Sequence, residues 1–409
     1  MPSSLYINRI DFTVCDNYDN YREKVVRIGH STIIISVETV MQLLFLCDHY
    51  FPYIGGAEIV NRAIAEYFAH TLDITVVSKS FRGLNDKRTQ INRVNIYRTA
   101  DVPRMLHSFA AYLSASRLAQ NADIILSATY ASGLAGHWLS RRYNKKSLLL
   151  VHEILGENWK LIKNPHFLYS WYERYIVTRP FDRYIAVSNY TRRRLIEYGI
   201  PENKVSVIYN GIDERRFYPR PIASELRKKL VGDTEFVYLF YGRPRGYKGL
   251  NYLLRAVSDI AGAIPSSKLV LILGLEPQPE YKKTLQLIDQ LSIRDKIVLL
   301  KPVPPEQLPD YINIADTVVV PSLSEGFGYA AAESCMLGKP VVVTNAGSLP
   351  EVVFGRVVMI EKADVQAIIK GVIQSYRGGW TIVPQKYFRW EDSLKQYDKI
   401  IKSLYYQKS

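Results

Sequence analysis

The sequence predicts an α/β protein of two domains, each built on a parallel sheet with helices on both faces. The chain has 409 residues, which is too long for one ordinary domain and suits two separate cores. Short apolar runs typical of buried strands alternate with helical stretches, and this alternation favours parallel sheets. Hydrophobic residues make up 47% of the chain, which is enough to fill both cores.

The first half of the chain carries the elements of the first domain. Residues 41–47 are expected to form its buried first strand, and a helix is expected from residue 57 to about 70. Residues 1–40 fit this pattern poorly, apart from a short strand over 24–28, so we expect an appended extension there. Further strands are predicted at 74–78, 94–97, 124–127, 147–151, 183–187 and 205–208, with helices at 104–119, 132–142 and 190–198.

The second half repeats the alternation without repeating the sequence. Strands are predicted at 236–241, 269–274, 297–300, 317–320, 340–344 and 357–360, with helices at 250–261, 328–337 and about 390–405. Pro219-Arg220-Pro221 would stiffen a link between the halves. We therefore place the domains at residues 41–215 and 216–385, with residues 386–409 as a final helix.

The stretch from Pro321 to Glu333 is the strongest candidate for a binding site. It joins the predicted strand 317–320 to a helix, and glycines at 326 and 328 let the backbone come close to a ligand. The free N–H groups and the dipole of the new helix favour a phosphate there. Glu325 and Glu333 have seven residues between them, so one carboxylate can face a ligand at the helix start and the other can reach a hydroxyl pair.

Three further turns follow predicted strands, where parallel sheets bind ligands. Gly55-Gly56 precedes a helix, so a phosphate or sugar could approach its backbone. Arg243 and Lys248 flank a turn rich in glycine and proline, and both cations could converge on one diphosphate, although such a turn can also be a solvated loop. His152 follows strand 147–151. It is either a hydrogen-bonded loop histidine or a neutral imidazole that binds a sugar hydroxyl.

Together these motifs resemble those of the retaining glycosyltransferases of family four, which have the two-domain GT-B fold. The resemblance covers about residues 41–404. It departs at Ser348, which stands where the family has the second glycine of a Gly-Gly-x-Pro-Glu turn, and in a trimmed hairpin after residue 353, so the role of Glu351 stays open. The resemblance implies that the final helix crosses back to the first domain.

The resemblance also implies roles for the residues of each motif. A sugar would pass from a nucleotide-diphosphate sugar to a hydroxyl of a sugar or lipid-linked acceptor, without cofactor or metal. Glu325 and His152 would be the catalytic residues, Glu333 would bind the ribose, and the base would lie near Val303. The diphosphate would be bound by Arg243, Lys248, Gly326, Phe327, Gly328, Gly55 and Gly56. A phosphorylase or a nucleotide-sugar epimerase on the same scaffold is the alternative.

The chain is strongly basic, with a net charge of +14 and a pI near 9.4. This favours contact with nucleotide phosphates, acidic lipids or nucleic acid, or simply marks a solvated surface. We do not expect nucleic acid, because the informative basic residues sit in turns rather than in one stripe. Aromatic and basic residues interleave over 159–175, where a helix could touch an anionic membrane or an acceptor, or pack on its domain.

Cysteine content and hydropathy suggest a location. The three cysteines, Cys15, Cys47 and Cys335, form no disulfide framework or zinc pattern, which is typical of a reducing cytosol. We expect neither a membrane-spanning segment, since no apolar run is long enough, nor a signal peptide, since the polar start lacks the charged-then-apolar order. We expect a cytoplasmic protein, with peripheral contact at the cytoplasmic face of a membrane as an option.

Overall fold

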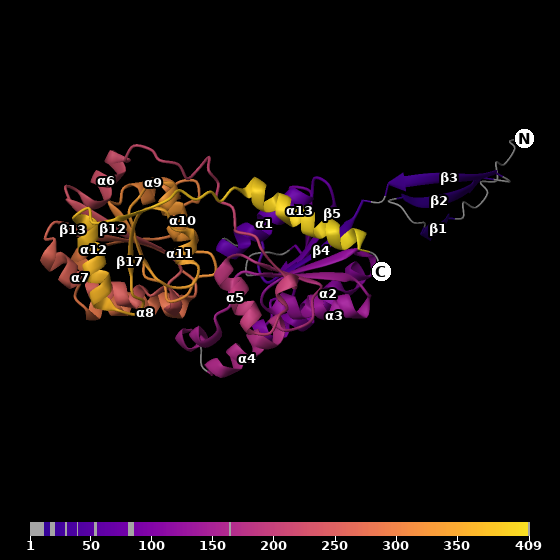
Figure 1. Ribbon diagram of the computed structural model, residues 1–409, viewed down its shortest axis with the longest axis horizontal. Coiled ribbons are helices and arrows are strands. Elements are labelled where there is room, and N and C mark those ends of the chain that lie inside the picture. The colour runs from indigo at the N-terminus through magenta and orange to yellow at the C-terminus, as the bar shows by residue number, and fades with distance from the viewer. Residues whose placement is uncertain are drawn as a thin grey trace, which may run out of the picture.

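The computed structural model describes residues 12–16, 21–28, 31–38, 40–52, 55–80, 86–162 and 165–407. Two large sheets, each covered by helices on both faces, form two α/β units that lie side by side (Figure 1). Both sheets are parallel except for one edge strand each. The predicted fold class is therefore confirmed.

The sheet of the N-terminal unit has eight strands in the order β11-β10-β9-β8-β4-β5-β7-β6. Its central strand β8 (Ile124–Ala128) is buried at all five positions, as a parallel strand covered on both faces must be. The edge strand β6 is antiparallel and was not predicted. The other strands are β4 (Gln42–Cys47), β5 (Asp73–Lys79), β6 (Arg88–Ile91), β7 (Val94–Thr99), β9 (Lys146–Val151), β10 (Arg183–Ala186) and β11 (Val205–Val207).

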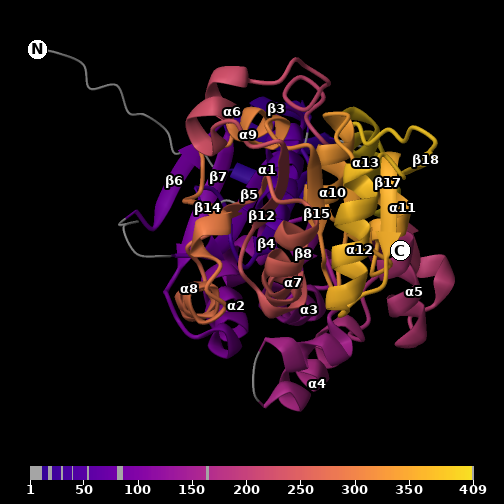
Figure 2. The same cartoon turned by 90° about the vertical axis from the view of Figure 1, so that its left-hand side faces the viewer.

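Helices cover both faces of this sheet (Figures 1 and 2). The face that carries α1 also holds the last helix of the chain, and α2 and α3 pack together on the opposite face. Ser188 caps α5, since its side chain accepts a hydrogen bond from the Thr191 N–H, as helix starts require. The helices are α1 (Gly56–Phe68), α2 (Arg104–Asn121), α3 (Ala131–Arg142), η1 (Gly156–Leu161), α4 (His166–Val177), α5 (Asn189–Glu197) and η2 (Glu202–Lys204).

The sheet of the C-terminal unit has seven strands in the order β14-β13-β12-β15-β16-β17-β18. These are β12 (Phe236–Gly242), β13 (Ser267–Leu273), β14 (Ile297–Leu300), β15 (Thr317–Val320), β16 (Val341–Thr344), β17 (Gly355–Ile360) and β18 (Thr381–Val383). Its helices are α6 (Ser224–Val231), η3 (Gly246–Lys248), α7 (Leu250–Ala263), α8 (Gln278–Gln290), η4 (Arg294–Lys296), α9 (Leu308–Asn313), α10 (Tyr329–Met336), α11 (Leu349–Val352) and α12 (Val365–Tyr376).

The last helix, α13 (Trp390–Tyr406), leaves the C-terminal unit and packs against α1 of the N-terminal unit (Figure 1). Leu394, Tyr397, Ile401 and Leu404 are its main buried residues, and their spacing of three and four places them on one helical face. This crossing-back is the predicted one. We propose the predicted domain limits at residues 215 and 385, since they fall in the two segments that connect the units.

An additional sheet precedes the first domain. Strands β1 (Phe12–Asp16), β2 (Tyr21–Ile28) and β3 (Ser31–Glu38) form an antiparallel three-stranded sheet, which Figure 1 places beyond the N-terminal unit. Only a short strand over residues 24–28 was expected. The run from Ser31 to Glu38 is rich in isoleucine and valine, which favour strands, and pairing with β2 supplies backbone partners that no single strand has.

Candidate active site

Glu325 and Lys248 meet at the carboxyl end of the C-terminal sheet. Glu325 follows β15, and its Oε1 accepts hydrogen bonds from Lys248 Nζ at 2.7 Å and from Ser322 Oγ at 2.8 Å. The carboxylate is buried. Burial by itself would lower the pKa of Lys248, but the charge and hydrogen bond of Glu325, together with Tyr247 and Glu153, outweigh it and the pKa is raised. Lys248 therefore stays a cation in a poorly solvated place, as a phosphate-binding lysine must.

Glycine conformations bring these two loops together. Gly249 has φ of +69°, and a β-carbon there would overlap the carbonyl oxygen of Pro321. The turn of η3 can thus lie directly on the loop after β15. Gly328 has φ of +92° at the N-cap of α10, which is a left-handed conformation that favours glycine. Another residue at position 249 would push η3 away from the loop of Pro321, whereas a β-carbon at position 328 would meet the side chain of Leu349.

The turn after β16 holds the backbone of Glu325. Gly347 has φ of +59°, and a β-carbon there would collide with backbone atoms of Glu325. The next residue, Ser348, donates from its N–H at 3.1 Å and from its Oγ at 3.2 Å to the Glu325 carbonyl oxygen. The serine that departs from the family pattern therefore adds a hydrogen bond that a glycine could not make.

His152 lies across the domain interface from this loop. A β-carbon at Gly326 would overlap the carbonyl oxygen of His152, so the two backbones touch. The ring Nε2 lies 3.1 Å from Oδ1 of Asn61, whose amide donates to the His49 carbonyl oxygen. Asn61 thus presents its oxygen, and His152 Nε2 carries the proton. Burial lowers the pKa of His152 to about 4, so the imidazole is neutral at physiological pH.

Arg243 also reaches across the interface. Its Nη2 lies 3.5 Å from Oε2 of Glu58, a buried residue in the first turn of α1. A β-carbon at Gly55 would overlap both groups, which explains why the glycine pair precedes this helix. Burial raises the pKa of Glu58, and Arg243 opposes that rise. Glu58 was not predicted to lie in the site, since an acid in a first helical turn indicates only a favourable helix dipole.

Glu333 lies further along α10 and is buried. Its Oε2 accepts a hydrogen bond from the hydroxyl of Tyr241 at 2.9 Å. Burial raises the pKa of Glu333 to about 7, and the hydrogen bond from Tyr241 opposes the rise. The carboxylate is thus poised to change its charge near neutral pH.

The remaining predicted residues lie nearby but differ in what they offer. The ring of Phe327 is buried, 5.3 Å from Phe388 and 5.1 Å from Tyr329, so a ligand could meet only its backbone. A β-carbon at Gly56 would be 3.1 Å from the ring of Tyr329. Val303 follows β14 and packs, partly buried, against the main core. These predicted contacts with a ligand stay predictions.

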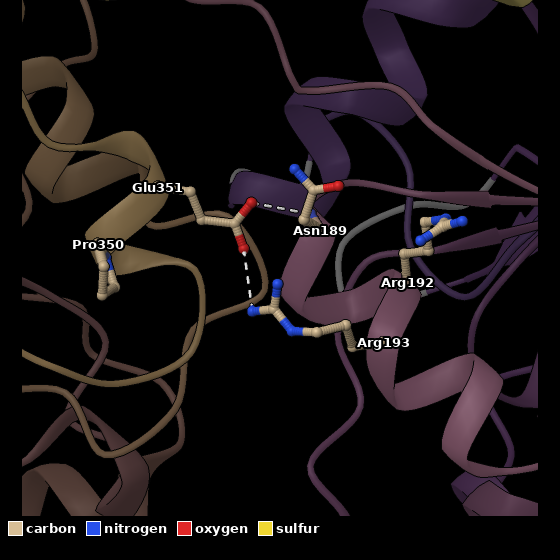
Figure 3. Close-up of a pocket in the computed structure, with 5 residues that line it drawn as sticks. All are labelled: Asn189, Arg192, Arg193, Pro350 and Glu351. Carbon is tan, nitrogen blue, oxygen red and sulfur yellow. Dashed lines mark hydrogen bonds and ion pairs between the residues drawn. The ribbon is translucent and has the colours of Figure 1, made fainter.

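Glu351 has a role that the sequence left open. Its carboxylate accepts a hydrogen bond from the N–H group of Asn189 at 2.9 Å (Figure 3) and another from the N–H group of Tyr190 at 2.6 Å, both at the start of α5 in the other domain. The Tyr209 hydroxyl donates to it as well. A cavity of about 420 Å³ opens here, lined by Asn189, Arg192, Arg193, Pro350 and Glu351. Glu351 therefore links the two domains.

Two parallel-sheet domains whose loops meet in this way define a GT-B protein, and comparison with known proteins specifies the family. Residues 222–381 match the glycosyl transferases group 1, and residues 54–216 match glycosyltransferase family 4. The two matches together span both domains, and the chain belongs to the group 1 and family 4 glycosyltransferases.

Sequence relatives agree with this assignment. A D-inositol 3-phosphate glycosyltransferase from Thermobifida fusca is 34% identical over 179 residues, which are 42% of this chain and 41% of that protein. An uncharacterized glycosyltransferase from Methanocaldococcus jannaschii is 29% identical over 330 residues, covering 76% of this chain and 83% of the relative. The chain thus matches less than half the length of the bacterial relative.

Solved structures share the fold. The sucrose-phosphate synthase from Thermosynechococcus elongatus superposes with a TM-score of 0.74 at 18% identity, over 90% of this chain and 100% of that one. HepE from Anabaena, in complex with UDP and glucose, has a TM-score of 0.69 at 21% identity, over 89% of this chain and 100% of its own. At such identities the likeness concerns the fold alone.

Proposed function

We propose that this protein is a retaining, metal-independent glycosyltransferase that moves a sugar from a nucleotide-diphosphate sugar to a hydroxyl group of a sugar or lipid-linked acceptor. The observation that carries the proposal is the contact of Lys248 with Glu325, next to the backbone contact of Gly326 with His152. A partly buried cation, a helix N-terminus and a neutral imidazole from the other domain thus lie together. That set suits a departing diphosphate beside a reacting sugar.

Departure of the diphosphate places negative charge on phosphate oxygens and positive charge on the anomeric carbon. Lys248, Arg243 and the N–H groups at the start of α10 stabilise the first charge, and such fixed donors contribute most in a dry site. Glu325 binds sugar hydroxyls and offsets the second charge. His152 has a pKa of about 4, so it acts as a hydrogen-bonding group and not as a cation. Closure of the two domains expels water and aligns the acceptor.

UDP-sugars are the first donors to test, because HepE is found with UDP and with UDP-glucose. The acceptor class stays open between a soluble polyol phosphate, as the name of the Thermobifida fusca relative suggests, and a lipid-linked sugar. None of the helices in the described part of the chain combines the length and hydropathy needed to cross a bilayer. We also propose a cytoplasmic location with peripheral contact at an anionic membrane surface.

A thermal-shift screen with UDP-, GDP- and ADP-sugars tests the donor part of the proposal. A ligand that binds only the folded state raises the unfolding temperature. At a concentration of one hundred times its Kd, it adds about 2.7 kcal/mol to the free energy of unfolding. We expect the sugars of one nucleotide to raise the unfolding temperature of the wild type and to leave that of Lys248→Met unchanged. Release of the sugar must then require a hydroxyl acceptor. Release to inorganic phosphate would indicate a phosphorylase, and an altered sugar without release would indicate an epimerase.

Donor affinity is expected to depend on pH through Glu333. Its pKa of about 7 means that the carboxylate ionises as the pH rises through neutrality. An ionised carboxylate accepts hydrogen bonds from ribose hydroxyls more strongly than the neutral acid, so affinity should increase with pH by about fivefold. Calorimetric titration with UDP, below and above that pKa, measures the increase. Glu333→Gln should remove it, and a variant that keeps the full pH dependence would exclude Glu333 as its source.

A further inference from the structure

Two helices of the N-terminal domain expose large apolar side chains that no other described element covers. The exposed fractions of these side chains range from 46% to 63%. On α2 they recur at spacings of three and four residues, which places them along one face of the helix. On α4 they lie in the first two turns. The six side chains, called here the apolar face, are Leu106, Phe109, Leu113, Phe167, Leu168 and Trp171.

The two helices that carry the apolar face touch one another. Ser108 of α2 lies between Leu106 and Phe109 in sequence, and its Oγ is 2.9 Å from the hydroxyl of Tyr172 on α4. Trp171 precedes this tyrosine, and its ring stacks on that of Tyr175 at 5.4 Å. Both helices lie on the same side of the N-terminal sheet in the two views (Figures 1 and 2). Large exposed apolar side chains on two touching helices indicate an interaction site.

Basic residues outnumber acidic ones on the helices that carry the apolar face and on α3 beside them. Helices α2, α3 and α4 contain five arginines, at positions 104, 117, 141, 142 and 174, and a single acidic residue. That acid, Glu173, is buried and accepts hydrogen bonds from the N–H groups of Leu155 and Gly156. The exposed carboxylate of Glu157 lies in the neighbouring η1. A surface with apolar side chains flanked by arginines fits an anionic lipid bilayer better than an acidic or a neutral protein.

The apolar face lies beside the candidate active site. Helix α4 contacts η1, and η1 contacts η3 of the other domain. A β-carbon at Gly246 in η3 would overlap the carbonyl oxygen of Leu161 in η1, and Tyr247 lies in one cluster with Trp159. Lys248 is the next residue. A molecule anchored in a bilayer under α4 would therefore be close to the loops that meet at Glu325.

We propose that the apolar face of α2 and α4 docks on an anionic membrane and that the acceptor is a sugar linked to a lipid of that membrane. Aromatic and aliphatic side chains enter the boundary between headgroups and acyl chains, and the arginines bind lipid phosphates. Docking itself does not depend on the proposed sugar transfer, whereas the lipid-linked acceptor rests on it.

Flotation of the full chain with vesicles tests the docking. Wild type should float with vesicles of phosphatidylcholine mixed with phosphatidylglycerol and stay behind with phosphatidylcholine alone. Phe109→Ser/Trp171→Ser should weaken the partition at least about tenfold, because two large apolar groups no longer enter the bilayer. Arg117→Gln/Arg174→Gln should weaken it roughly tenfold, and more salt should weaken the wild type.

Matched control variants distinguish a role of the apolar face from the general effect of losing an apolar side chain or positive charge elsewhere on the protein. Ile382→Ser removes an apolar side chain that is 71% exposed in β18 of the other domain, and Arg215→Gln/Arg377→Gln removes the same net charge away from the apolar face. Both should float like the wild type. Thermal unfolding and the nucleotide-induced shift should persist in Phe109→Ser/Trp171→Ser, and Lys248→Met should still float. Docking and the proposed function can thus fail separately.

Three outcomes would overturn the proposal. The first is a wild type that does not float with anionic vesicles, and the second is a Phe109→Ser/Trp171→Ser variant that floats like the wild type. The third is an Arg117→Gln/Arg174→Gln variant that floats as well as the control Arg215→Gln/Arg377→Gln. A wild type that is dimeric by light scattering, monomeric after Phe109→Ser/Trp171→Ser and indifferent to lipid would assign the apolar face to self-association.

Discussion

Replacing Glu325 by glutamine is expected to lower kcat roughly a hundred- to a thousandfold, the cost of removing one charged group that stabilises a transition state. The variant keeps the size of the side chain and a hydrogen-bond acceptor for Ser322, but it removes the charge that faces the reacting sugar. Initial rates at saturating donor and acceptor measure the loss. Turnover near that of the wild type would exclude Glu325 from catalysis.

The structure also predicts a cost in stability, which the sequence had not suggested. Glu325 is the partner of Lys248 in a buried ion pair, so Glu325→Gln leaves the ammonium group without its counter-ion. We expect a loss of about 1–3 kcal/mol in the free energy of unfolding. Urea unfolding measures it. Glu325→Gln/Lys248→Met should lose less than the sum of the two single variants, since it leaves neither charge alone.

Lys248→Met is expected to lower kcat/KM by roughly a hundredfold, because the departing diphosphate loses a fixed cation. The thioether chain fills the space of the lysine stem without charge. Donor KM should rise along with the fall in kcat, since the lysine contacts the diphosphate both before and during its departure. Calorimetry with UDP measures the loss of donor affinity, and steady-state kinetics measure the loss in kcat and the rise in donor KM.

A matched variant makes this result specific. Lys339 is buried and Lys248 is partly buried, but the Nζ of Lys339 donates to the carbonyl oxygen of Asn313 in a structural contact. Lys339→Met should reduce stability and leave the donor KM unchanged. An unaltered response of Lys248→Met to donor concentration would remove Lys248 from the site.

Much of the fold was accessible from the sequence because it depends on local patterns. The apolar runs of β4, β8 and β15 mark parallel strands, since a strand buried on both faces needs side chains of one kind. The short edge strands β6 and β18 were not predicted, as strands of three or four residues at a sheet edge carry little hydrophobic pattern. The sheet of β1, β2 and β3 was not predicted, apart from a short strand over residues 24–28. Its stability comes from backbone hydrogen bonds between the three strands, which no pattern within one strand reveals.

The contents of the candidate site divide in the same way. Loops after parallel strands gather at the carboxyl ends of those strands. Glu325 and Lys248 could therefore be assigned to that end of the second sheet, and His152 to that end of the first, from their order in the chain. Contacts between the domains could not be found so. Glu58 lies 185 residues before its partner Arg243, and Glu351 lies 162 residues after Asn189. No pattern within a short segment encodes such pairs.

The sequence by itself determined two α/β domains, the loops that carry the candidate site and the charged residues in them, because strand burial and turn chemistry act over a few neighbouring residues. The tertiary structure decided which carboxylate faces which cation, how far burial shifts the pKa of His152 and Glu333, and which side chains of α2 and α4 stay exposed. Each of these depends on atoms that are distant in the chain and are brought together only when each domain folds and the two domains pack.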